Sequence, residues 1–178
     1  MELANLIACI CEGGAERAII YILLDNRLLI FSREQLLDEK IIRCRTGEEF
    51  ERRYLRKSFK DKISVIRVLD SKKENFKLGK AYQYMVDVIN IITAPEIEML
   101  IICNENKFNE FNRSQYKKPS DFCKSCLKMT SVKKYEFVHN YFSDPNTLIS
   151  AIKKHHRISN LKKLDCDRGQ YTLLDILK

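Results

Sequence analysis

The sequence predicts an α/β domain in which helices flank a mostly parallel sheet and a helical cap follows. Over the first ~110 residues, short apolar runs typical of buried strands alternate with stretches of helical periodicity. The connections between these runs are long enough for parallel crossovers, which place helices on the faces of a sheet. Beyond them only helical patterns remain. We therefore expect an α/β core over residues 1–110 and a helical C-terminal cap over residues 111–178, packed as one domain.

The first strand and the first helix are predicted on either side of a short acidic turn. Leu6–Cys11 is an apolar run, and Arg17–Leu24 has the spacing of a helix. Between them stand Glu12 and Glu16, separated by two glycines and an alanine. A carboxylate at such a junction lies at the carboxyl end of a strand, where open α/β sheets place their chemistry. The alternative is an exposed turn residue at Glu12 and an ordinary first-turn acid at Glu16.

Short elements are predicted next. Ser32 and Gln35 have the spacing of a capping box before a helical turn. Ile41–Arg45 is predicted to be a short strand. Thr46 is the expected N-cap of a helix over Glu48–Arg56, whose first turn carries acidic residues that suit the helix dipole.

Two further strands and one long helix are predicted in the middle of the chain. Ile63–Leu69 is the clearest β-branched run and ends at Asp70. A helix is predicted over Lys80–Ile92 because apolar residues recur there at helical spacing. A buried strand is predicted over Ile97–Cys103, closely followed by Glu105. Acids at the ends of these strands and of the first one would converge on one edge of a parallel sheet.

The C-terminal third is predicted to be helical. One helix is expected to begin near Lys107 and another at Pro119, with Ser120 or Asp121 as its cap. No apolar run approaches the ~18 residues that a membrane span needs, so we expect no membrane association. The remaining helical stretches are Lys134–Phe142, Leu148–His156 and the short turn Leu173–Leu177.

Positive charge is concentrated in the second half of the chain. The formal net charge is +8, and eight Lys and Arg residues stand against two acids between Lys107 and Lys134. Such asymmetry favours a polyanionic partner, although solvated lysine faces would give the same composition. The candidate residues for binding nucleic-acid phosphates are Lys73, Lys117, Lys118, Lys153 and Lys154.

The cysteines indicate a reducing environment. They are seven in number and scattered, and the first residues lack the pattern of a secretory signal. A cytoplasmic protein with free thiols therefore fits better than a disulfide framework. Cys123 and Cys126 form a single C-x-x-C pair, whereas a structural zinc site needs four ligands. We expect no zinc there, with one cysteine facing the core and the other partly exposed.

The acidic turn and the strand that ends at Asp70 together resemble the Toprim fold. This is the metal-dependent catalytic domain of topoisomerases, primases, OLD-family nucleases and several small phage-defence nucleases. In that family a first strand ends in Glu-Gly before a helix, and a later strand ends in an Asp-x-Asp pair. Glu12-Gly13 matches the first element and Asp70 the first aspartate, whereas Lys72 stands where the second aspartate would fall. The resemblance covers roughly residues 5–110.

The resemblance implies hydrolysis of phosphodiester bonds with Mg²⁺ or Mn²⁺. It implies that Glu12 is a general base or a metal ligand and that Asp70 holds the metal ion. Glu16, one helical turn further on, would ligate the ion directly or support its ligands. Lys72 or Lys73 would contact a phosphate, although a lysine in place of an acid opposes metal binding by its charge.

Three functions are compatible with these residues. The first is a Mg²⁺-dependent nuclease or nuclease-like subunit. By the resemblance, it would act in bacterial defence against phage with a larger ATPase partner, since the chain has no phosphate-binding loop of its own. The second is a catalytically degenerate Toprim-like subunit used for assembly or sensing, with a homo-oligomer as one form. The third is a basic nucleic-acid-binding module that needs no metal.

Overall fold

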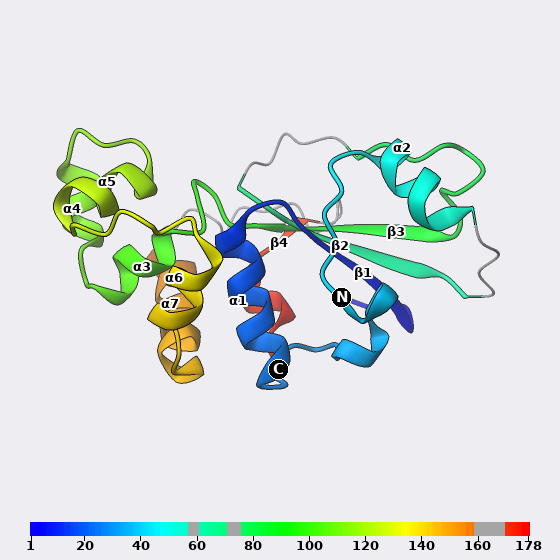
Figure 1. Ribbon diagram of the computed structural model, residues 1–178, viewed down its shortest axis with the longest axis horizontal. Helices are drawn as coiled ribbons and strands as arrows, with labels where there is room; N and C mark the ends of the chain where they lie inside the picture. Colours follow the sequence, from blue (N-terminus) through cyan, green and yellow to red (C-terminus); the bar gives the residue numbers. More distant parts are fainter. Residues whose placement is uncertain (57–60, 71–75, 159–169) are drawn as a thin grey trace.

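The protein is built around a four-stranded sheet in which all strands are parallel (Figure 1). The computed structural model describes residues 1–56, 61–70, 76–158 and 170–178. In spatial order the strands are β1 (Leu6–Cys11), β2 (Ile63–Leu69), β3 (Val86–Ile92) and β4 (Gln170–Tyr171). Helices flank this sheet, so the predicted α/β class with a helical C-terminal part is confirmed.

The pairing register brings the carboxyl ends of the strands to one edge. Cys11 of β1 lies opposite Val68 of β2, and Leu69 of β2 lies opposite Ile92 of β3. The residues that follow these three strands, Glu12, Asp70 and Thr93, therefore leave the sheet side by side. We call this the carboxyl edge of the sheet.

Helices cover both faces of the strands. Figure 1 shows α1 (Gly14–Asp25) packed along one face and α2 (Gly47–Phe50) on the other, where a π-helical turn, Glu51–Leu55, continues it. The C-terminal helices gather together beside α1, and α7 packs against α3. They are α3 (Met99–Asn104), α4 (Phe108–Arg113), α5 (Pro119–Cys126), α6 (Tyr135–Tyr141) and α7 (Pro145–Ile158).

The two larger hydrophobic clusters lie on opposite faces of the sheet, because the strands are buried on both faces. Ile7, Cys9 and Cys11 of β1 pack into the larger cluster with α1 and the C-terminal helices. Ala8 and Ile10, which point the other way, pack into the cluster beneath α2. Burial on both faces explains why β1 is a continuous apolar run and why even Ser64 and Arg67 of β2 are buried.

Two predicted elements were wrong in type. The region predicted as a helix over Lys80–Ile92 forms turns and then β3, because its β-branched residues lie in the interior of the sheet between β2 and β4. The region predicted as a strand over Ile97–Cys103 forms α3. That helix is buried on all sides, so its sequence lacks the polar face that marks an ordinary surface helix.

Because Ile97–Cys103 is not a strand, one predicted acid does not lie at the carboxyl edge. Glu105 does not follow a strand but caps the C-terminal end of α3. There its carboxylate accepts a hydrogen bond from the hydroxyl of Tyr141 on α6. This contact ties two of the C-terminal helices together and takes Glu105 out of the predicted set of converging acids.

Smaller differences concern the short elements. The predicted capping box of Ser32 and Gln35 is present, and Thr46 caps α2 by accepting a hydrogen bond from the backbone N–H of Glu49 (3.1 Å). Ile41–Arg45 makes only an isolated bridge to β1, at Ile42. The helix predicted to be capped by Ser120 or Asp121 already begins at Pro119. The C-terminal β4, which pairs with β3 through two residues, was not predicted.

Candidate acidic site at the carboxyl edge of the sheet

The two acids on which the sequence analysis depended lie at the ends of adjacent strands. Glu12 follows β1 and Asp70 follows β2, and these strands are hydrogen-bonded in parallel register. Asp70 is exposed, and the side chain of Glu12 is 35% exposed. Glu12 Oε2 lies 3.2 Å from Nε of Arg45, a residue the sequence analysis did not single out. Both acids can therefore meet a ligand that approaches the carboxyl edge.

Glu16 turns back from α1 toward the same edge. A Cβ atom added to Gly13 would lie 2.0 Å from Oε2 of Glu16, so the carboxylate occupies the space that a side chain at this position would need. Burial is the main cause that raises the pKa of Glu16, and the charges of Asp70 and Glu12 raise it further. The three predicted metal ligands thus act on one another electrostatically.

Two buried acids at this edge were not predicted as site residues. Thr93 follows β3, and both its backbone N–H and its hydroxyl donate to the carbonyl oxygen of Leu69 (2.7 and 3.0 Å). These bonds fold the chain after β3 across the end of β2, next to Asp70. Glu96 and Glu98 follow and are only 7% and 4% exposed. Charged residues are rarely this buried without a partner or a function.

Lys133 is a cation that pairs with Glu96 and feels the charge of Glu98. Its Nζ donates to Oε1 of Glu96 (2.9 Å), while the backbone N–H of Ser120 donates to Oε2 (2.9 Å). Partial burial opposes the charge of Lys133, but the hydrogen bond to Glu96 and the charges of Glu98 and Asp70 outweigh it, so its pKa is raised. We call Glu12, Glu16, Asp70, Glu96, Glu98 and Lys133 the edge cluster.

The second glycine of the acidic turn fixes the position of Lys133. A Cβ atom added to Gly14 would lie 2.8 Å from the carbonyl oxygen of Lys133 and 2.9 Å from the backbone nitrogen of Tyr135. The start of α1 therefore packs directly on the backbone of the turn before α6. The segment Glu12–Glu16 supplies two acids to the edge cluster, and its two glycines give the space that Glu16 and Lys133 need.

The edge cluster offers oxygen ligands but no complete metal cage. In residues 1–56, 61–70, 76–158 and 170–178, no three His, Cys, Asp or Glu side chains are grouped so that they could hold a metal ion. Mg²⁺ is usually held by one or two carboxylates together with waters and substrate phosphates, which these acids can supply. The predicted phosphate contacts Lys72 and Lys73 lie outside the described residues.

The other predicted phosphate-binding lysines fall into two groups. Lys117 and Lys118 are exposed and lie just before Ser120, which binds Glu96, so they stand near the edge cluster. Lys153 and Lys154 lie in the last turns of α7. Lys154 donates a hydrogen bond to Asn106, just beyond the end of α3. The first group is therefore the better candidate for contacts to a substrate at the edge.

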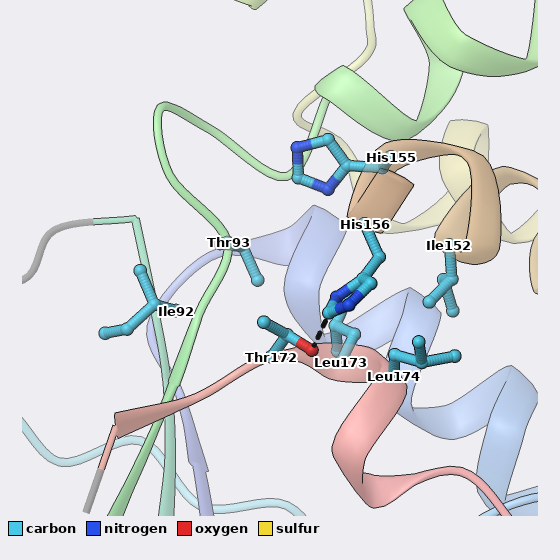
Figure 2. Close-up of a pocket in the computed structure, with 8 residues that line it drawn as sticks. All are labelled: Ile92, Thr93, Ile152, His155, His156, Thr172, Leu173 and Leu174. Carbon is cyan, nitrogen blue, oxygen red and sulfur yellow. Dashed lines mark hydrogen bonds between the residues drawn. The ribbon is translucent and has the colours of Figure 1, made fainter. Parts of the chain in front are cut away.

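A small polar cavity lies next to the end of β3. His155 is 6% exposed, and its Nε2 has no hydrogen-bond partner among the described residues. Burial, helped by the charge of His156, lowers the pKa of His155 to about 4, so the ring is neutral at physiological pH. Figure 2 shows His156, whose Nδ1 lies 3.3 Å from Oγ1 of Thr172, between His155 and Thr172. The cavity of about 10 Å³ has room for a single water molecule.

The cysteines described are free thiols. Cys123 is fully buried and Cys126 is exposed, as predicted for the C-x-x-C pair. Burial raises the pKa of the Cys123 thiol to about 12, so it is not a ready nucleophile. None of the described helices combines the length and the apolar character that crossing a bilayer requires.

The raised pKa of Glu98 predicts that the stability of the protein depends on pH. Burial is the main cause that raises its pKa to about 7 from an ordinary value of 4.5. Between these two values the unfolded chain is ionised while the folded chain still holds the proton. The free energy of unfolding should therefore fall as the pH rises from about 4.5 to about 7, by about 3 kcal/mol, and then level off.

Urea unfolding of the Glu98→Gln variant across this pH range measures the effect. The variant should lose this component of the pH dependence and be more stable than the parent protein in mildly alkaline buffer. The Glu136→Gln variant, which changes an exposed acid on α6, is the matched control and should keep the parent slope. An unchanged slope in Glu98→Gln would show that Glu98 is ionised in the folded protein at neutral pH.

The edge cluster can attract an anion, hold a cation and exchange protons. Lys133 keeps a side chain that is 61% exposed, Glu12 and Asp70 are open to solvent, and Glu98 titrates near neutral pH. This combination suits acid–base chemistry on a charged substrate. Comparison of the chain with family models, with curated proteins and with solved structures gave no match.

Proposed function

We propose that this protein is a Mg²⁺-dependent phosphodiesterase that cleaves nucleic acid at the edge cluster. The observation that supports this proposal most directly is the electrostatic coupling of Glu16, Asp70 and Glu98 with Lys133 at the carboxyl edge of the sheet. Ligand sites of open α/β sheets lie at this position. Carboxyl groups with perturbed pKa values cluster at functional sites.

The exposed and buried residues of the edge cluster would have different roles in the reaction. Asp70 and Glu12, which reach solvent, would hold the metal ion with Glu16 in support. When bound, the metal ion would polarise the phosphate and lower the pKa of a water molecule. The ammonium group of Lys133 would attract the phosphate diester, and the carboxyl group of Glu98 would take up or release a proton near neutral pH. Lys117 and Lys118 would bind further phosphates along the nucleic-acid strand.

The wider biological setting belongs to the same proposal. On the resemblance of its acidic motifs, the protein would act in the bacterial cytoplasm, in defence against phage, together with a larger ATPase partner. The free thiols of the described cysteines are compatible with a reducing compartment. Cleavage assays on labelled DNA and RNA distinguish between the two classes of substrate.

The test is cleavage of labelled single-stranded and double-stranded DNA and RNA with Mg²⁺ or Mn²⁺, compared with EDTA. Asp70→Asn and Glu16→Gln should each reduce the cleavage rate by about a hundredfold or more, because each removes one charged oxygen group from the site. The control is Asp87→Asn, which changes an exposed acid on β3. Unchanged thermal unfolding of the variants would show that the loss is chemical. Equal activity in EDTA, or in both variants, would refute the proposal.

A second function, a non-catalytic assembly or sensing subunit, is favoured by one specific observation. Two acids of the edge cluster are already neutralised within the protein, Glu12 by Arg45 and Glu96 by Lys133. If this reading holds, the chain cleaves nothing with any metal, alone or with its partner, and Asp70→Asn leaves partner binding intact. Co-purification and cleavage assays on the same samples separate the two functions.

A further inference from the structure

The segment that carries Arg45 is attached to the first strand of the sheet. The backbone N–H of Cys11 donates to the carbonyl oxygen of Ile42 (3.2 Å), and the N–H of Ile42 donates to the carbonyl oxygen of Cys9 (2.9 Å). Ile42 and Cys44 are buried, whereas the alternate residues Arg43 and Arg45 are exposed. The alternation places both arginines on the solvent side of the segment, beside the carboxyl end of β1.

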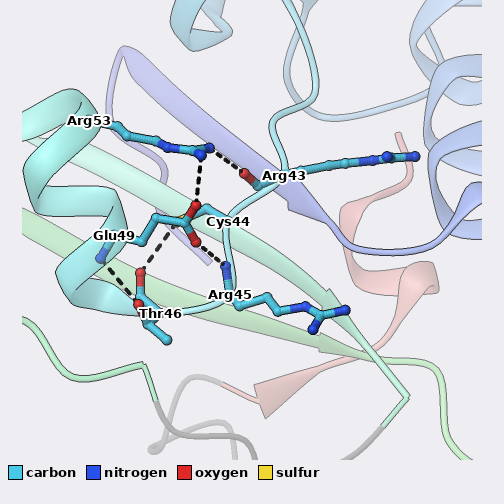
Figure 3. Close-up of polar contacts among 6 residues, drawn as sticks. All are labelled: Arg43, Cys44, Arg45, Thr46, Glu49 and Arg53. Carbon is cyan, nitrogen blue, oxygen red and sulfur yellow. Dashed lines mark hydrogen bonds and ion pairs between the residues drawn. The ribbon is translucent and has the colours of Figure 1, made fainter.

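The backbone of this segment is fixed further by side chains from the α2 region (Figure 3). The N–H of Arg45 donates to Oε2 of Glu49 (3.1 Å), and Nη1 of Arg53 donates to the carbonyl oxygen of Arg43 (3.3 Å). Glu49 also pairs with Arg53 (3.0 Å), so its carboxylate is already satisfied. Figure 3 shows the side chains of Arg43 and Arg45 extending away from this network, to the side opposite α2.

The contact between Arg45 and Glu12 has the properties of an exchangeable ion pair. The Arg45 side chain is 80% exposed, and its Nε lies 3.2 Å from Oε2 of Glu12. Exposed pairs of this kind contribute only about 0.2–1 kcal/mol, because water screens them and the side chains lose entropy. Guanidinium groups bind phosphate with two parallel hydrogen bonds, which is a stronger and more specific geometry.

We propose that Arg43 and Arg45 form a phosphate-binding pair, and that a nucleic-acid phosphate draws Arg45 away from Glu12 so that Glu12 becomes free to bind the metal ion. This inference rests on the proposed function and adds an order of binding to it. In the free protein Arg45 neutralises Glu12 and weakens metal binding at the edge cluster. The metal ion and the nucleic acid therefore bind with positive cooperativity, which must be reciprocal.

The experiment measures binding and not cleavage. Mn²⁺ affinity is measured by electron paramagnetic resonance without nucleic acid, and affinity for a fluorescent oligothymidylate is measured in EDTA over a range of salt concentrations. The Arg45→Met variant should bind Mn²⁺ about two- to fivefold more tightly, which corresponds to the loss of one exposed ion pair. It should bind the oligonucleotide more weakly, with the salt slope reduced by about one.

Two neighbouring variants provide matched controls. Arg43→Met should weaken oligonucleotide binding in the same way and leave Mn²⁺ affinity unchanged, because Arg43 does not pair with Glu12. Arg52→Met removes another exposed charge from the same region and should change neither quantity by more than the small general effect of charge. Arg45→Lys keeps the positive charge but cannot form two parallel hydrogen bonds to a phosphate, so it should keep the parent salt slope and lose part of the oligonucleotide affinity.

The outcomes separate this inference from the proposed function. If Arg45→Met binds Mn²⁺ no more tightly than the parent protein, the exchange mechanism is overturned, even if metal-dependent cleavage is observed. If Mn²⁺ binds only to the Arg45→Met variant, the mechanism is supported in its strongest form. If Mn²⁺ binds to neither protein, with or without the oligonucleotide, both the inference and the metal-dependent function are wrong. If cleavage needs the metal ion but the parent protein and Arg45→Met bind Mn²⁺ equally well, the exchange mechanism is wrong and the proposed function stands.

Discussion

Replacing Gly14 with alanine is expected to destabilise the protein and, at the same time, to abolish the proposed cleavage of nucleic acid. The added Cβ would lie 2.8 and 2.9 Å from backbone atoms of Lys133 and Tyr135, which cannot rotate away as a side chain can. The start of α1 and the turn before α6 would have to separate, and overpacking of this kind typically costs about 1–3 kcal/mol. Because that turn carries Lys133, the edge cluster would open at the same time.

The neighbouring glycine should behave differently. In the Gly13→Ser variant the atoms nearest to the new Cβ belong to the carboxylate of Glu16, with Oε2 at 2.0 Å, and this flexible group can turn aside. Serine is at least as good an N-cap as glycine, so the stability of α1 should be retained. Cleavage should nevertheless fall, because Glu16 has left its place at the carboxyl edge.

Urea unfolding and cleavage assays on the two variants distinguish these effects. Gly79→Ala is the matched control, since its Cβ would come no closer than 3.4 Å to the Glu51 side chain, an ordinary contact. It should leave both quantities nearly unchanged. Wild-type stability in Gly14→Ala would mean that α1 and the turn before α6 do not pack as closely as described.

Replacing Lys133 with methionine is expected to have the second large effect. Glu96 is 7% exposed and would keep its hydrogen bonds to Ser120 but lose its cationic partner. Breaking a buried pair by removing one member leaves an uncompensated charge and costs about 3–5 kcal/mol. Since the Lys133 side chain is 61% exposed, water compensates in part, and we expect a loss of about 1–3 kcal/mol.

The pH dependence and a double mutant test this explanation. Lys133 is one cause of the lowered pKa of Glu96, so without it the acid should protonate more readily. The destabilisation should therefore be larger in mildly alkaline than in mildly acidic buffer. Adding Glu96→Gln to Lys133→Met should restore most of the stability but none of the cleavage. Lys134→Met, at the adjacent exposed lysine, should be nearly neutral, and an equal loss there would contradict the role of Lys133.

Local sequence patterns were sufficient to predict β1, β2 and the acids that follow them at the carboxyl edge. The apolar run that ends at Glu12 and the β-branched run that ends at Asp70 were predicted as strands because their length and composition exclude most alternatives. Long connections then made parallel pairing the expected arrangement, and the register of β1 and β2 agrees with it. The chemical roles of Glu12, Glu16 and Asp70 remain predictions.

The acids that follow β3 were not predicted as site residues, because the secondary-structure types of two neighbouring segments were predicted the wrong way round. β3 was predicted as a helix and α3 as a strand. In α3 periodicity carries little information, because the helix is buried and no polar face is left to mark the period. In β3 the polar residues Asp87 and Asn90 stand three positions apart, a spacing that also fits a helix. As a result Glu96 and Glu98 were not assigned to the site. Two acids within an otherwise apolar stretch, Glu96-Ile97-Glu98, were the available signal.

Local patterns were enough to predict the fold class and the positions of Glu12 and Asp70, because strand length, apolar content and turn residues are local properties. The pairing of Lys133 with the buried Glu96 and of Arg45 with Glu12 became visible only in three dimensions. These contacts join residues that are dozens of positions apart. They depend on packing distances, such as that between Gly14 and the backbone of Lys133, which no local pattern encodes.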